Sequence, residues 1–218
     1  MKKLFSAINN GNFEVVQEII KKKPELVNCI AKAPPKRDEG QSPLKVAIKN
    51  GYYEIVDFLI EQDADVNFIP QTTCDGHLIP IISQAVYSAL RKARNPTYTG
   101  CKDKNGMSEY LIFGDKEVFQ NALSILKRVI SAGADLTATD NYGNSCLEEA
   151  VREALRFGSR FCFPERTYLP VVVEWEEDIK EVFNLLITNG VSTEISDERL
   201  NLKWLITGKN NLLKFLME

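Results

Sequence analysis

The residue types that most often do chemistry are sparse in this chain. His77 is the only histidine among 218 residues, so a Ser-His-Asp or Cys-His arrangement has one possible base. No serine or cysteine stands in a nucleophile-elbow pattern, and no glycine-rich phosphate loop occurs. A single histidine near a turn is typical of a solvated or hydrogen-bonded side chain. The sequence therefore predicts no catalytic residue, no enzyme activity and no cofactor.

Patterns that would bind a metal are equally weak. "DKNG" at 103–106 is a turn signal, and the other ligands of a calcium loop are missing. The cysteines are odd in number, far apart and without a CxxC pair, which favours reduced thiols in an intracellular protein over a disulfide frame or a zinc site. We expect no metal site and a cytoplasmic location, with export as an effector left open. The cysteines are Cys29, Cys74, Cys101, Cys146 and Cys162.

Charge and hydropathy exclude further classes. The net charge of −3 is spread along the chain and gives no case for nucleic-acid binding. No apolar run reaches the roughly 18 residues that cross a membrane, and no apolar core follows the two N-terminal lysines, so no signal peptide is expected. Basic residues do cluster once, either as a solvated group or as a contact for an acidic partner. They are Arg91, Lys92, Arg94, Lys102 and Lys104.

Internal repetition is the strongest signal in the sequence. An apolar pair followed four residues later by another predicts one wide helix face, as in Val15-Val16/Ile19-Ile20. The same spacing recurs four more times, at Ile55-Val56/Leu59-Ile60, Ile125-Leu126/Val129-Ile130, Val182-Phe183/Leu186-Ile187 and Leu212-Leu213/Leu216-Met217. Related phrases follow these helices: "KPELVN", "DADVN", "GADLT" and "GVSTE".

A second phrase precedes three of these helices and predicts a turn followed by a shorter helix. "GQSPLKVAIKNG" and "GNSCLEEAVREA" show it clearly, and "LIPIISQAVYSA" shows it weakly. A small residue stands at the centre of each short helix, where two helices can approach closely: Ala7, Ala47, Ala85 and Ala150. The repeating unit is therefore turn, helix, helix, turn.

This unit resembles the ankyrin repeat, which has a period of about 33 residues and a T-P-L-H-x-A signature. The resemblance implies an all-α ankyrin-repeat solenoid with β-turn fingers, forming one domain over 1–218. We count about five repeats, at 1–30, 38–68, 75–137, 140–193 and 197–218. Lys45 and Glu148 replace the signature histidine, so the turns that this histidine normally bonds are expected to be held in another way. Trp204 near the alanine position of the last unit fits a terminal cap.

Two units are expected to carry long insertions, at about 95–116 and 158–178. Gly11 and Gly51 end the first helix in units one and two, whereas Ala89 and Ala154 occupy that position in units three and four. Alanine favours helix, so these first helices should run on, the earlier one to Asn95 before Pro96. Each insertion has a strand-like run, "EYLIF" or "YLPVVVEW". The insertions either cover helix ends or form a shared binding platform in which their strands pair.

The resemblance implies a non-enzymatic scaffold that binds a protein partner through its concave face, turn tips and inserts. Alternatives are a microbial effector, inhibitor or immunity-type protein acting on a specific protein target, and an enzyme with a site between the inserts. A monomer without nucleic-acid or membrane partners is expected, and the partner's identity stays open. The positions carried over as protein-binding are Asn9, Asn10, Gln41, Lys49, Asn50, His77, Tyr87, Ser88, Asn141, Tyr142, Asn144, Arg152 and Glu153.

Overall fold

The computed structural model describes residues 1–192 except 34, 103, 105, 107 and 159–169. Most of this part of the chain is helical, as the repeat pattern predicts. The helices are α1 (Lys2–Asn9), α2 (Phe13–Lys22), α3 (Pro43–Asn50), α4 (Tyr53–Glu61), α5 (Ile81–Lys92), α6 (Lys116–Ser131), α7 (Cys146–Gly158) and α8 (Pro170–Thr188). Short 3-10 turns cover Pro24–Asn28 and Lys36–Asp38, and the strands are β1 (Asn95–Lys102) and β2 (Ser108–Phe113).

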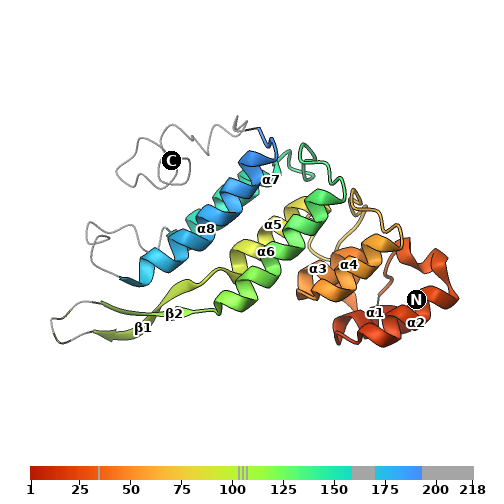
Figure 1. The fold of residues 1–218 in the computed structure, drawn as a ribbon, viewed down its shortest axis with the longest axis horizontal. Coiled ribbons are helices and arrows are strands. Elements are labelled where there is room, and N and C mark those ends of the chain that lie inside the picture. The colour runs from red at the N-terminus through yellow and green to blue at the C-terminus, as the bar shows by residue number, and fades with distance from the viewer. Residues whose placement is uncertain (34, 103, 105, 107, 159–169, 193–218) are drawn as a thin grey trace.

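The helices form four antiparallel pairs that stack in chain order (Figure 1). First helices contact first helices, from α1 to α3, α5 and α7, and second helices likewise follow from α2 to α4, α6 and α8. Each pair therefore touches only its neighbours, as in a solenoid. These pairs correspond to the first four predicted units. The predicted fifth unit, 197–218, lies outside the described residues.

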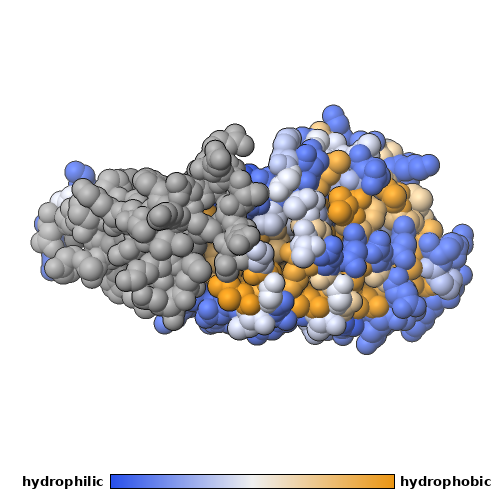
Figure 2. Space-filling view, turned by 90° about the horizontal axis from the view of Figure 1, so that it is seen from above, coloured by the Kyte–Doolittle hydropathy of each residue, from blue (hydrophilic) through white to orange (hydrophobic). Residues whose placement is uncertain are grey.

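Burial follows the repeated positions of the sequence pattern. Val16 and Ile20 of the first apolar pattern are fully buried, as are Val56 and Leu59 of the second. The small residues at the centres of the first helices are buried too, which lets successive helices lie close together; they are Ala7, Ala47, Ala85 and Ala150. In the view from above, apolar residues show through between hydrophilic ones (Figure 2).

The glycine position decides where the first helix ends. Gly51 caps α3 in the left-handed region, with φ +82°, which glycine reaches without steric cost. Ala89 lies inside α5 instead, and this helix continues to Lys92. The predicted extension is confirmed, but its predicted end at Asn95 is wrong. Ala93 already adopts an extended ψ of 150° and begins the turn into β1.

The first insertion is a β-hairpin rather than half of a sheet shared by two insertions. β1 and β2 pair with each other, with Asn95 opposite Phe113 and Tyr98 opposite Tyr110, and the hairpin extends away from the helix stack (Figure 1). The predicted strand in "YLPVVVEW" is wrong, because α8 starts at Pro170 and includes Trp175. Proline fits the first turn of a helix, where its missing N–H has no partner to lose.

The two insertion regions nevertheless meet. α8 contacts both β1 and β2, and Arg94 at the base of the hairpin donates hydrogen bonds to Asp178 of α8 through Nε at 3.0 Å and Nη2 at 2.9 Å. The predicted packing of Ile112 on Val172 involves side chains that lie outside the described residues. The contact that the structure does describe is therefore ionic.

Asparagine side chains tie consecutive units together at the ends of the second helices. Asn28 accepts from the Asp65 amide at 2.8 Å and donates to the Asp63 carbonyl at 3.0 Å. Asn67 repeats this arrangement one unit later, accepting from the Asp135 amide at 2.7 Å. The recurring "VN" in the sequence therefore encodes a ladder of hydrogen bonds between units.

Candidate functional site

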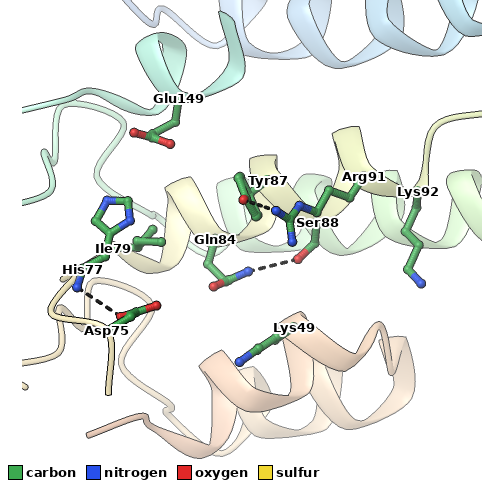
Figure 3. A pocket seen from close by; sticks show the side chains of 10 residues that line it. All are labelled: Lys49, Asp75, His77, Ile79, Gln84, Tyr87, Ser88, Arg91, Lys92 and Glu149. Carbon is green, nitrogen blue, oxygen red and sulfur yellow. Dashed lines mark hydrogen bonds between the residues drawn. The ribbon is translucent and has the colours of Figure 1, made fainter. Parts of the chain in front are cut away.

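A pocket of about 600 Å³ opens on the side of the stack formed by the first helices (Figure 3). It lies between α3, α5 and α7 and is closed at one end by the turn that precedes α5. Its lining combines cationic, acidic and aromatic side chains: Lys49, Asp75, His77, Ile79, Gln84, Tyr87, Ser88, Arg91, Lys92 and Glu149.

Lys45 of α3 supports the pocket wall, because it bonds Ile79, one of the lining residues. It stands where the repeat signature has histidine, is only 3% exposed, and its Nζ donates a hydrogen bond to the Ile79 carbonyl of the next unit. Lysine thus takes over the bridging role of the signature histidine, so this turn is held in another way, as expected. Glu148 acts within its own unit, where its carboxylate accepts from the Ser145 amide at 2.6 Å in a capping box.

Burial lowers the pKa of Lys45 to about 7, helped by repulsion from Lys49. The unfolded chain holds the proton of the Lys45 amine up to about pH 10.4, whereas the folded chain loses this proton near pH 7. Between these values the unfolded state binds more protons, so stability rises with pH. Above the unfolded pKa the penalty for charging the buried amine is absent.

We therefore expect the free energy of unfolding to rise by about 1–2 kcal/mol between pH 7 and pH 8.5 because of Lys45. Urea unfolding followed by circular dichroism at several pH values measures this slope. Lys45→Met should remove the rise, whereas Lys127→Met, at an exposed lysine on α6, should retain it. Equal slopes in the wild type and Lys45→Met would contradict the assignment.

One end of the pocket is positively charged. The Arg91 guanidinium lies over the Tyr87 ring, 3.9 Å from its centroid, and its Nε donates to the Glu153 carboxylate at 3.0 Å. Lys49 and Lys92 are exposed residues of the lining, and neither forms an ion pair with any residue that the structure describes. Arg91 is thus held in place, while the two lysines have charge available for a ligand.

The other end combines histidine with carboxylates. His77 Nε2 lies 2.7 Å from Asp140 Oδ2, and the ring packs against Tyr142 with centroids 5.4 Å apart. Asp140 is fixed further by the Asn144 amide at 2.8 Å. Burial by itself raises the pKa of Asp140, but the hydrogen bonds from Asn144 and His77 hold it below the ordinary value. Burial raises the pKa of Glu149.

The structure brings four of the predicted binding residues into this pocket: Lys49, His77, Tyr87 and Ser88. Others lie apart from it. Asn9 and Asn50 bond each other at 3.1 Å beside the exposed Asn10, and Gln41 is half-buried in the second finger. Tyr142 is 69% exposed at the tip of the fourth finger.

Asn141 and Arg152 already have protein partners. Asn141 accepts from the Leu78 amide at 2.8 Å and so joins the third and fourth fingers. Arg152 Nη1 lies 3.8 Å from the Glu149 carboxylate.

Two predicted residues are not surface residues. Asn144 is 5% exposed because it bonds Asp140, and Glu153 is 4% exposed because it faces Arg91. Assigning binding residues from the family resemblance assumed that every such position in the first helix or finger faces solvent. Here the long α5 and α7 bring polar side chains together, and these two residues support the site rather than contact a ligand.

Sequence reasoning missed several lining residues, notably Asp75, Gln84 and Glu149. Arg91 and Lys92 had a signal, because they belong to the basic cluster. Arg94 of that cluster instead joins an ion network around the buried Asp178. The missed residues come from separate units, and nothing in their spacing along the chain reveals that they meet.

No helix in the described ranges combines the length and apolarity needed to cross a bilayer. A family model for ankyrin repeats, in three copies, matches residues 2–69. An ankyrin repeat protein of Acanthamoeba polyphaga mimivirus is 24% identical over 203 residues, covering 84% of this chain and 25% of that protein. The chain therefore spans about a quarter of the length of this relative.

A solved ankyrin repeat domain from Acinetobacter baumannii AYE is 19% identical, with a TM-score of 0.46 and coverage of 98% of this chain and 95% of that one. The family model shows ankyrin repeats over residues 2–69, and the described helices form a mostly helical stack of antiparallel pairs.

Proposed function

We propose that this chain is a non-enzymatic scaffold that binds a protein partner in the pocket between α3, α5 and α7, with the partner's acidic side chains at its cationic end. Ankyrin repeats are generally protein–protein interaction modules. The observation that carries the proposal is the pocket itself, which is open to solvent on the first-helix side and has lysines without ion-pair partners among the described residues.

Charge complementarity indicates the kind of partner. Lys49 of α3 and Lys92 of α5 both line the pocket, from two neighbouring units (Figure 3). A partner carboxylate placed beside either ammonium group would gain attraction from it, and such complementarity sets specificity and association rate. A basic partner side chain would be repelled at the same place.

Tyr87 is the expected energetic anchor of the interface. Its ring is held by the Arg91 guanidinium, which is itself fixed by Glu153. Binding therefore loses little side-chain entropy at this tyrosine. Aromatic and arginine side chains also dominate interface hot spots, so a partner group stacked here would contribute more than one on the surrounding lysines. We propose Tyr142, exposed at the fourth finger tip, as a second contact.

Selection from a displayed random-peptide library tests this proposal without knowledge of the natural partner. Peptides recovered on the wild type should be enriched in Asp and Glu. They should lose at least tenfold in affinity for Lys49→Glu/Lys92→Glu and for Tyr87→Ala.

The matched control is Lys127→Glu, which reverses an exposed lysine on the second-helix side and should leave peptide binding unchanged. Peptides without acidic enrichment, or peptides that bind the double variant as well as the wild type, would overturn the proposed site. Circular dichroism of each variant shows whether a loss of binding reflects a loss of fold.

A further inference from the structure

Three potential metal ligands converge at the acidic end of the pocket. His77 comes from the third finger, Asp140 from the fourth finger and Glu149 from the first turn of α7. One ligand atom from each lies within 4.8 Å of the other two. His77 is separated from Asp140 by 63 residues, so the stacking of unit three on unit four brings it to the two carboxylates.

Glu149 is the member of this cluster that most needs a partner. Its side chain is 9% exposed, and Arg152 Nη1, with which it forms an ion pair, is 3.8 Å away, beyond hydrogen-bond distance. Figure 3 shows the carboxylate at the end of the pocket on the same side as the His77 ring. Among the described residues no group donates a hydrogen bond to this largely buried carboxylate, and a cation between it and His77 would offset the cost of burying its charge.

The other two ligands are already oriented. Asp140 has a fully buried side chain, and its Oδ1 accepts from the Tyr142 and Asn144 amides, each at 2.8 Å. Its Oδ2 accepts from Asn144 Nδ2 at 2.8 Å and faces His77 Nε2. Hydrogen bonds of this kind orient ligands in metal sites, and Tyr142 packs against the imidazole ring.

We propose that His77, Asp140 and Glu149 form a binding site for a divalent transition-metal ion, with zinc the best match. One imidazole nitrogen and two carboxylate oxygens are a ligand set that Zn²⁺ accepts, and three protein ligands leave a fourth position open. That position faces the pocket, where water or a ligand atom can occupy it. The 2.7 Å contact between His77 and Asp140 must lengthen as the ion enters and the proton that it holds leaves.

This site goes beyond the proposed protein binding and does not depend on it. It predicts that zinc bridges two neighbouring units and so stabilises their stacking, since an ion that binds the folded chain alone shifts unfolding by mass action. Binding should weaken at acidic pH, because protons compete for the imidazole and carboxylates.

Titration calorimetry of the full chain, stripped with EDTA and titrated with ZnCl₂, tests the site. We expect about one ion per chain with micromolar affinity, reduced at least tenfold in Glu149→Gln and in His77→Ala. Glu149→Gln is the decisive variant because it keeps the shape of the side chain, and its melting temperature without metal should not fall. Cys74→Ser is the matched control, because this exposed thiol on the same finger is the obvious alternative ligand.

Two spectroscopic measurements identify the bound atoms. His77 is the only histidine, so the imidazole nitrogen resonances in an NMR spectrum report this site alone and should shift on zinc addition. Co²⁺ bound here should show d–d bands without thiolate charge-transfer bands. Zinc binding that survives Glu149→Gln and His77→Ala, that disappears in Cys74→Ser, or that is absent below millimolar concentration would overturn the proposal.

Discussion

Replacing Asp178 with alanine is expected to lower the free energy of unfolding by about 3–5 kcal/mol. Asp178 is fully buried in α8 and accepts from the Arg94 amide, from Arg94 Nε and Nη2 and from Lys116 Nζ, at 2.9–3.0 Å. Removing the carboxylate leaves the Arg94 guanidinium, only 13% exposed, without its main counter-charge. Urea unfolding at pH 7 followed by circular dichroism measures the loss.

Glu177→Ala is the matched control for this prediction. Glu177 also pairs with Arg94, at 3.4 Å, but its side chain is 61% exposed. Solvent-exposed ion pairs contribute about 0–1 kcal/mol, so this variant should unfold nearly as the wild type does. Similar losses in the two variants would show that burial does not give Asp178 its importance.

The pH dependence of stability, compared between the wild type and Asp178→Ala, adds an independent check. Burial by itself raises the pKa of Asp178, but hydrogen bonds from Arg94 and Lys116 together hold the pKa below its ordinary value. A lowered folded pKa gives stability that is present above the unfolded pKa, about 3.9, and is lost as the pH falls through the folded value. The difference between wild type and Asp178→Ala should therefore shrink below about pH 4.

Much of the fold follows from the sequence because each repeated position has a local physical cause. The apolar pairs predict the second helices, and the small residues mark where first helices touch. Gly51 predicts that the first helix of its unit ends early, and Ala89 predicts that the first helix of its unit continues. These signals act within a few residues of each other, so periodicity alone reveals them.

The pocket could be predicted only in part, because it is assembled across units. Lys49 and Tyr87 follow from the family's surface positions, and Arg91 and Lys92 follow from a basic cluster. Nothing in the sequence says that Glu149 faces His77, or that Glu153 turns inward to Arg91. Those contacts depend on the lengths of α5 and α7, which place polar side chains opposite one another.

The start of α8 is where local sequence preference misled most. Its β-branched valines, at 171–173, favour a strand when considered alone. The buried positions follow helical spacing instead, at Trp175, Ile179, Val182, Phe183 and Leu186. This spacing forms one apolar face of a helix, and burying that face against the neighbouring units outweighs the preference of three valines.

Trp175 belongs to that apolar face and is the largest of the fully buried side chains in the part of the chain that the structure describes. Trp175→Ala should therefore lower the free energy of unfolding by about 3–5 kcal/mol, through lost burial and the cavity left behind.

Trp175→Phe should cost less, below about 2 kcal/mol. Trp175 Nε1 is buried without a hydrogen-bond partner among the described residues, so phenylalanine keeps most of the apolar contact and leaves no donor unpaired. Val118→Ala, at a side chain 45% exposed on α6, should change stability by no more than about 0.5 kcal/mol. Urea unfolding of the three variants ranks them. If Trp175→Ala were as mild as Val118→Ala, the first turns of α8 would not pack against the core, and the helical register that places Trp175 beside Ile179 would be wrong.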